Sequence, residues 1–457
     1  MLDPTLLIAI TISAIVLLLV LVLWVKLHPF LSLLITAMFL GIATGMPLTG
    51  VIDAVKNGLG GTLGFVATVV GIGAIFGQIL ESSGGTESLA QTLIKKFGPG
   101  KAHLSLMLAG FLIAIPVYFE VGFIMLVPVV YSLARDTKKS VLYYAIPLLA
   151  GLAVTHTFVP PTPGPVATAE MIGADMGWVI LVGAIIGLPV AFIAGPLFGA
   201  FISKRIYVEA PPIEEAGLQK DDTADEKYKK LPSFGMVTSI IGIPLLLMIL
   251  SSFAEFAVKQ GYVADGRFVE ICNFIGHPFS ALIIATLLAA WLLCTRRGFT
   301  RKEVLDISAK ALAPAGMIIL IIGAGGALKE MLIQSGVGGM LADTISQTNF
   351  PPIVLAFIIA AVVRLILGSA TVSMITAAGI IAPILDVYTI SEVHRALIVI
   401  SIASGATIFS HVNDSGFWLV GKYLRMTEVQ TLKSWSVMET IISLCGFLLA
   451  LTISFFV

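Results

Sequence analysis

The sequence contains two weak copies of one pattern, and this repetition constrains the fold more than any other feature. A His-Pro-Phe triplet begins at His28 and again at His277, and further along His156 corresponds to His411. Glycine-rich segments between these points match in the same order. Ordered matches at a slowly drifting shift indicate a duplicated unit. Two such units, each interrupted by Gly or Pro at equivalent places, are typical of secondary transporters when the chain is a membrane protein.

Hydropathy places the chain in the membrane. Hydrophobic residues make up 58% and charged residues 12% of the 457 residues, and the mean hydropathy is +1.02. A soluble protein of this size could not bury so much apolar surface. We therefore predict an all-α polytopic membrane protein. The expected apolar helical runs are Leu6–Val25, Pro29–Met46, Leu63–Leu80, Leu104–Leu133, Leu142–Ile172, Trp178–Ile202, Phe234–Phe253, Ile271–Cys294, Leu312–Leu332, Pro351–Leu385, Ala396–Tyr423 and Trp435–Val457.

A single long polar stretch, residues 203–233, divides the chain. We predict a first membrane repeat over residues 1–202, a flexible surface linker over 203–233, and a second membrane repeat over 234–457. The fourth apolar run in each half is too long for one span and is interrupted in its middle. Interpreted as a re-entrant hairpin, it leaves five spans per half, so the second repeat is inverted relative to the first. This gives about ten spans plus two hairpins; the alternative is twelve or more spans.

The distribution of Lys and Arg residues supports one orientation of the chain in the membrane. With the linker placed in the cytoplasm, 21 of the 27 Lys and Arg residues fall inside, as the positive-inside rule requires. Both termini are then periplasmic. The zero net charge excludes a nucleic-acid-binding surface, and the three cysteines indicate neither a disulfide framework nor a metal site.

Four interruptions are expected near the membrane midplane: Ile115–Gly122, His156–Pro165, Gly368–Val372 and Ser410–Gly416. Non-helical backbone at that depth is tolerated only where protein or a water-filled cavity satisfies it. Half-helices that start after such breaks direct N–H groups and positive dipole ends into the site. The breaks therefore predict a binding site for an anionic group.

Five ionisable side chains lie in or beside these breaks: Glu120, His156, Arg364, His411 and Asp414. Ionisable groups inside a membrane are costly and are usually functional. Four of these residues could instead have a purely structural role. His156 could bond a carbonyl, Asp414 could cap the following half-helix, Glu120 could cap a hairpin near water, and Arg364 could extend to the membrane interface.

The motifs at these positions resemble those of the gluconate:proton symporter family of bacterial inner-membrane permeases, over nearly the whole chain. The most specific segments are Gly60–Gly64, Glu120–Gly122, Pro160–Pro165, Gly368–Val372 and Ser410–Trp418. In the first broken segment Thr157 stands where the family usually has Gly, and Thr162 stands where it has His, so both should tune which polyol fits. The resemblance implies a two-repeat ion-transporter fold with a scaffold and a mobile transport part, and a homodimer. Its members carry gluconate and other sugar acids, and one branch carries D-serine.

Together these observations predict a transporter, not an enzyme: a proton-coupled importer of a small hydroxylated carboxylate, without a cofactor. Sodium coupling stays open, because unwound carbonyls with hydroxyls and carboxylates would also bind Na⁺. The runner-up is a sodium- or proton-coupled carrier of a small amino or dicarboxylic acid; a passive channel and an intramembrane enzyme are disfavoured. The expected substrate-binding residues are Thr157, Pro161, Thr162, Gly164, Arg364, Ser369, Ala370, Thr371 and Asn413. The expected coupling residues are Glu120, His156, His411 and Asp414.

Overall fold

The computed structural model describes residues 3–211, 231–337, 339–340, 351–385, 388 and 390–457, and every regular element in these ranges is helical. The elements before residue 212 are α1 (Pro4–Leu23), α2 (Pro29–Ala43), α3 (Leu48–Ser82), α4 (Gly85–Phe97), η1 (Pro99–Lys101), α5 (Ala102–Ile113), α6 (Phe119–Thr137), α7 (Leu142–Phe158), α8 (Pro163–Ile172), α9 (Met176–Phe192), η2 (Ile193–Leu197) and α10 (Phe198–Ile202). Those after residue 230 are α12 (Phe234–Lys259), α13 (Arg267–Gly276), α14 (Pro278–Ala289), η3 (Ala290–Cys294), η4 (Thr295–Arg297), α15 (Arg301–Gln334), α17 (Pro352–Leu367), α18 (Ala370–Leu385), α19 (Glu392–Gly405), α20 (Ser415–Tyr423), α21 (Glu428–Thr431), η5 (Leu432–Ser436) and α22 (Val437–Ser454).

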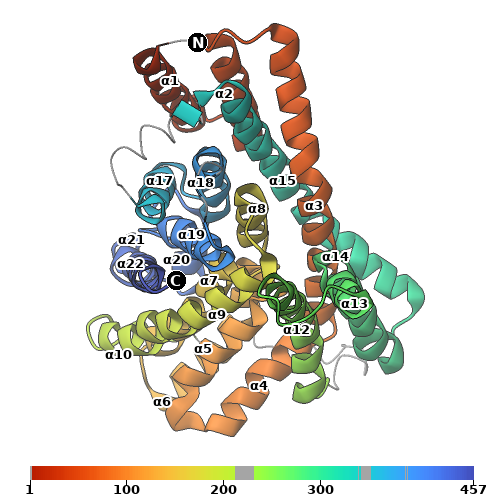
Figure 1. Cartoon of the computed structure of the whole chain (residues 1–457). Helices are drawn as coiled ribbons and strands as arrows, with labels where there is room; N and C mark the ends of the chain where they lie inside the picture. The colour runs from red at the N-terminus through yellow and green to blue at the C-terminus, as the bar shows by residue number, and fades with distance from the viewer. Residues whose placement is uncertain (1–2, 212–230, 338, 341–350, 386–387, 389) are drawn as a thin grey trace.

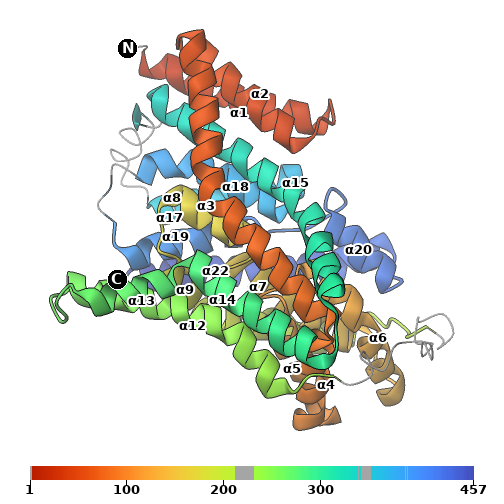
Figure 2. The same ribbon diagram turned by 90° about the vertical axis from the view of Figure 1, so that its right-hand side faces the viewer.

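The two longest helices, α3 and α15, run side by side and form the most extensive helix pair of the molecule (Figures 1 and 2). Small residues allow their close approach: a Cβ added to Gly58 would lie 2.4 Å from the carbonyl oxygen of Gly326. A side chain at either position would push the helices apart, because a packed interface cannot absorb an added methyl at that distance. Helices α1 and α2 lie at one end of this pair, and α14 packs along α3.

The second body of the fold is a bundle centred on α7 and α19. Nearly every residue of α7 is buried, because α5, α6, α9 and η2 pack around it. Helix α19 contacts α17, α22 and α9, and α8 packs against α18 and α3. Helix α8 thereby connects the bundle to the α3–α15 pair, and the site described below lies inside the bundle.

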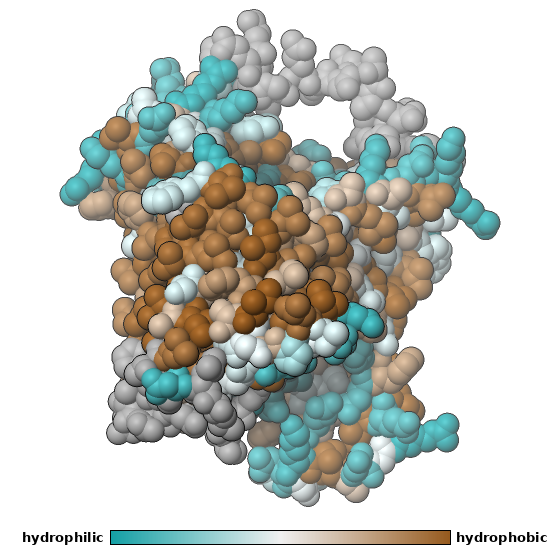
Figure 3. All heavy atoms as spheres, turned by 90° about the horizontal axis from the view of Figure 1, so that it is seen from above, coloured by the Kyte–Doolittle hydropathy of each residue, from teal (hydrophilic) through white to brown (hydrophobic). Residues whose placement is uncertain are grey.

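The apolar surface fits a membrane protein. Among the described residues, seven helical segments are long and apolar enough to cross a bilayer: 48–82, 142–172, 176–202, 234–259, 278–297, 301–334 and 428–454. Five shorter apolar helices accompany them. Seen from the end where α1 and α2 lie, hydrophobic side chains cover a broad face with hydrophilic ones at its margins (Figure 3). Large apolar side chains such as Ile12, Val16, Phe39 and Ile42 are exposed on these two helices. The prediction of an all-α polytopic membrane protein is confirmed at this level.

Each of the four predicted interruptions coincides with a helix end. Helix α5 ends at Ile113 and α6 starts at Phe119; α7 ends at Phe158 and α8 starts at Pro163. In the second half only Gly368 and Ser369 separate α17 from α18, whereas residues 406–414 separate α19 from α20. The first predicted break is shifted, because Glu120 lies inside the first turn of α6 and not in the connection.

The described ends of the predicted linker are anchored to the bundle. The Val141 N–H donates to the Val208 carbonyl at 2.9 Å, and Ser140 Oγ accepts from the Val208 N–H at 3.0 Å. At the other end, Ser88 Oγ donates to the Pro232 carbonyl at 2.6 Å. Residues 212–230 of the predicted linker lie outside the described residues.

Candidate functional site

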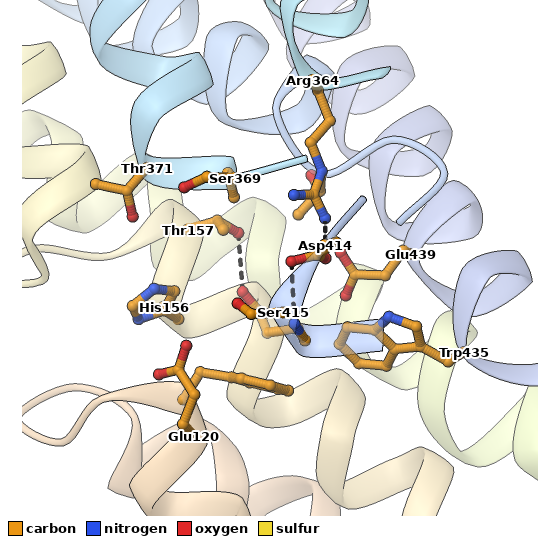
Figure 4. A pocket seen from close by; sticks show the side chains of 15 residues that line it. Glu120, His156, Thr157, Arg364, Ser369, Thr371, Asp414, Ser415, Trp435 and Glu439 are labelled. Carbon is orange, nitrogen blue, oxygen red and sulfur yellow. Dashed lines mark hydrogen bonds and ion pairs between the residues drawn. The ribbon is translucent and has the colours of Figure 1, made fainter. Parts of the chain in front are cut away.

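Three helices begin at one cavity inside the bundle. The first residues of α6, α18 and α20 line it together with α7, the end of α17 and the η5–α22 segment. The cavity opens to solvent, and its empty space, with the solvent at its mouth included, is about 520 Å³. The lining residues are Phe119, Glu120, Ala153, His156, Thr157, Arg364, Ser369, Ala370, Thr371, Thr407, Asp414, Ser415, Gly416, Trp435 and Glu439 (Figure 4). Helix starts carry a partial positive charge and unpaired N–H groups, so their convergence favours an anion.

A buried ion pair forms one wall of this cavity. Arg364 Nη2 lies 2.6 Å from Asp414 Oδ2, and the two side chains are only 3% and 11% exposed. Arg364 Nη1 also donates to the carbonyl of Gly368, which connects the guanidinium to the start of α18. A buried charge that loses its partner is strongly destabilising, so the pair ties the end of α17 to the start of α20.

Asp414 is held on both of its oxygens. Its Oδ1 accepts the Gly416 N–H at 3.0 Å, which caps α20, and its Oδ2 accepts from Ser410 Oγ as well as from Arg364. Ser410 is in turn fixed by Trp435, whose indole Nε1 donates to Ser410 Oγ at 2.7 Å. The capping role that the sequence offered for Asp414 and its place in the cavity are therefore both present.

The opposite wall holds Glu120 and His156. Figure 4 shows the Glu120 carboxylate extending from α6 toward the imidazole on α7. His156 Nδ1 is buried without a hydrogen-bond partner in the described part of the chain, and Glu120 is exposed to the cavity side. This arrangement leaves two groups able to exchange protons in contact with the cavity.

Hydroxyl groups line the space between these two walls. Thr157 reaches it from α7, Thr371 from the first turn of α18, and Ser369 from the connection between α17 and α18 (Figure 4). The Thr157 hydroxyl donates to the Ala153 carbonyl at 2.8 Å, and Ser369 Oγ accepts the Val372 N–H at 3.4 Å. Each hydroxyl can both donate and accept, so the region suits a ligand that carries hydroxyls of its own.

Five predicted site residues lie outside this cavity. Pro161 and Thr162 line a smaller cavity beside α3 and the α5–α6 connection, and the Thr162 hydroxyl donates to the Val159 carbonyl at 2.7 Å. Gly164 packs against Met374 of α18. The remaining two, Asn413 and His411, are placed within hydrogen-bond distance of the Leu365 carbonyl, at 2.9 and 3.0 Å. They satisfy the C-terminal carbonyls of α17, which have no partners within the helix.

Sequence reasoning missed Glu439, Trp435, Thr407 and Ser415. Glu439 is the strongest omission, because it is a carboxyl group within the apolar run that begins at Trp435. A single acid inside an apolar span is a recognisable signal. Trp435 packs on Phe119 with ring centroids 5.4 Å apart, and this contact closes the cavity between η5 and the start of α6.

Broken helices that meet around a polar, buried cavity in an apolar helical bundle define a membrane transporter. The fold is similar to that of the Alcanivorax borkumensis YdaH transporter, with a TM-score of 0.65 at 15% identity, covering 94% of this chain and 98% of that one. The chain belongs to the GntP family of permeases, whose family model matches residues 5–456. It is 43% identical to a gluconate permease of Pseudomonas aeruginosa, over 96% of this chain and 95% of that protein. It is 40% identical to a low-affinity gluconate transporter of Escherichia coli, over 95% of each chain. The expected family and the expectation of a transporter in place of an enzyme are confirmed.

Proposed function

We propose that this protein is a proton-coupled symporter that imports gluconate or a closely related sugar acid across the bacterial inner membrane. The observation that carries the proposal is the cavity itself, which is lined by three helix starts, one guanidinium and several hydroxyls. That chemistry matches a carboxylate at one end of a polyol chain. The names of the similar permeases point to the same substrate.

The substrate carboxylate binds at the start of α18. Of the three helix starts, that of α20 is already occupied by the Asp414 carboxylate, and that of α6 carries Glu120 in its first turn. Helix α18 has no acidic residue in its first turn and presents Ala370 and Thr371 to the cavity. An anion placed there gains the N–H donors and the dipole without displacing another carboxylate. The hydroxyls of Thr157 and Ser369 then face the polyol.

The proposal extends to the architecture. The two halves act as inverted repeats with re-entrant hairpins α5–α6 and α17–α18, the α3–α15 pair belongs to a scaffold, and two copies form a dimer. The 203–233 segment faces the cytoplasm. In support, the described start of this segment bonds Ser140 and Val141, which directly follow α6. The start of α1 lies at the opposite end of the molecule from α6 (Figure 2). A cysteine placed in this segment should resist impermeant reagents in intact cells, and strong labelling from outside would reverse the orientation.

Uptake measurements test the function. Cells that lack their own gluconate uptake and express this chain should accumulate labelled gluconate, and a protonophore should abolish the accumulation. Excess unlabelled aldonate should compete, whereas the matching alditol should not, because buried donors left unpaired cost about 1–3 kcal/mol per group. Dependence on Na⁺ in place of the proton gradient would reject proton coupling. Equal competition by aldonate and alditol would reject carboxylate recognition.

A further inference from the structure

Glu439 is a buried carboxyl group that the transport scheme so far leaves unused. It lies on α22, only 3% exposed, and it lines the same cavity as Asp414 and Arg364. Its Oε1 is buried and has no hydrogen-bond partner among the residues the structure describes. Figure 4 shows the carboxyl group directed at the Arg364–Asp414 pair. A carboxylate without donors is expensive to bury, so this side chain is stable here as the neutral acid.

The neighbouring groups cannot neutralise an ionised Glu439 fully. Both terminal nitrogens of Arg364 are directed elsewhere, to Asp414 and to the Gly368 carbonyl. Asp414 adds a second negative charge beside Glu439. Glu120 and His156 are the other titratable groups facing the cavity, on its far wall. With Glu439 neutral the near wall has no net charge; with Glu439 ionised it is negative before any anion enters.

Asp414 is poorly suited to carry the proton that Glu439 can carry. Both Asp414 oxygens accept hydrogen bonds, so protonation would displace a donor from Arg364, Ser410 or the start of α20. Glu439 loses no bond when it gains a proton at Oε1, and it loses none when it releases one. The two acids therefore divide the work: Asp414 holds the structure of the site, and Glu439 is free to change its charge.

We propose that Glu439 carries the coupling proton of the symport. A proton from the outer solution adds to a Glu439 carboxylate oxygen, which removes a negative charge from the cavity and permits the substrate anion to bind. The neutral acid and the anion cross together, and the proton returns to water on the inner side. Proton and anion then raise each other's affinity by the same factor, as linkage requires. This inference rests on the proposed function and names the group that performs its coupling.

The decisive variant is Glu439→Gln, which mimics a permanently neutral acid. In vesicles it should still exchange labelled gluconate for unlabelled gluconate in counterflow, because that exchange needs no net proton movement. It should lose at least tenfold in accumulation driven by a proton gradient. Glu428→Gln, a change of an exposed acid at the start of α21, is the matched control and should behave as the unaltered protein does. Normal accumulation by Glu439→Gln would overturn the proposal.

A second measurement does not depend on how well the variant folds. The Kd of purified, unaltered protein for gluconate should rise as the pH is increased, approaching tenfold per pH unit once Glu439 is ionised in the empty site. Glu439→Gln should remove this rise and Glu428→Gln should keep it. A Kd that is independent of pH in the unaltered protein would overturn the proposal even if Glu439→Gln cannot be produced. Absence of gluconate binding and uptake by the unaltered protein would instead reject the proposed function.

Discussion

The break between α7 and α8 and the break between α19 and α20 occupy corresponding places in the two halves, but they are stabilised in different ways. The first is four residues long, Val159–Thr162, and is buried throughout. Two prolines restrict its backbone, and within the described residues its one side-chain hydrogen bond is the local one from Thr162 to Val159. The second spans residues 406–414 and is held by Ser410, Asp414 and their bonds to α17 and η5.

The difference assigns separate tasks to the two halves. The connection Val159–Thr162 is stiff and uncharged, and it fixes where α8 starts. The ionisable groups that the first half contributes to the cavity are therefore Glu120 on α6 and His156 on α7. The second connection supplies charge itself through Asp414 and binds Arg364. The two halves therefore contribute differently to the cavity, and the wall formed by Arg364 and Asp414 comes from the second half alone.

The largest effect should follow from breaking the charged connection. Asn caps a helix as well as Asp does, so Asp414→Asn keeps the cap of α20 but leaves Arg364 buried without a counter-charge. We expect gluconate uptake to fall roughly 100-fold and the free energy of unfolding in detergent to fall by about 3–5 kcal/mol.

A double variant separates the two losses. Arg364→Leu combined with Asp414→Asn removes both charges and keeps the cap of α20, so stability should largely return while uptake stays absent. Uptake at the normal rate by Asp414→Asn would show that Asp414 is only a cap.

An intermediate effect is expected on the wall opposite. Glu120→Gln removes a charge that faces the His156 imidazole but has no ion-pair partner of its own in the described structure. We predict a roughly tenfold loss of uptake, about 1.4 kcal/mol, with little change in the unfolding midpoint. Initial rates of uptake per amount of membrane-embedded protein measure this effect. A loss as large as that of Asp414→Asn would show that Glu120 in the first half contributes as much to uptake as the Arg364–Asp414 pair does.

Two threonines test which break contacts the substrate. Thr371 lines the main cavity, whereas Thr162 bonds its own break and lines the smaller cavity. Thr371→Val should raise the KM for gluconate about five- to tenfold, the cost of about one hydrogen bond at roughly 1–1.4 kcal/mol. Thr162→Val should leave KM unchanged and lower stability by about 1 kcal/mol. A larger increase in KM for Thr162→Val than for Thr371→Val would place the substrate at the proline-rich break between α7 and α8.

The smallest effect is expected at Asn413. Its amide donates to the Leu365 and Ile366 carbonyls at 2.9 and 3.2 Å from an exposed position. Asn413→Ala should lower uptake less than about threefold, because water can replace exposed hydrogen bonds at a helix end. Uptake rates with matched expression levels decide this. A loss comparable to that of Thr371→Val would show that Asn413 binds substrate, as the sequence pattern suggests.

The helix breaks were predictable, and the pairings across them were not. Prolines and glycines at 160–165 and 368 act locally, so the sequence alone located the interruptions. The Arg364–Asp414 pair joins residues 50 positions apart and depends on how α17 lies against α20. The sequence predicts that Asn413 binds substrate; in the structure its amide donates to the Leu365 and Ile366 carbonyls at the end of α17, a contact that no local pattern indicates. Glu439 is missed although a single acid in an apolar run is a recognisable signal, because it lies outside the four predicted breaks in which the site residues are expected.

Protection of substituted cysteines tests the central claim most directly, namely that the substrate lies at the start of α18 and not in the proline-rich break. The three native cysteines, Cys272, Cys294 and Cys445, are first replaced by alanine. Thr371→Cys and Thr162→Cys are then labelled with a small thiol reagent in the presence of gluconate or its alditol. We predict that gluconate, but not the alditol, slows labelling at position 371 and leaves position 162 unaffected. Protection at 162 without protection at 371 would contradict the account.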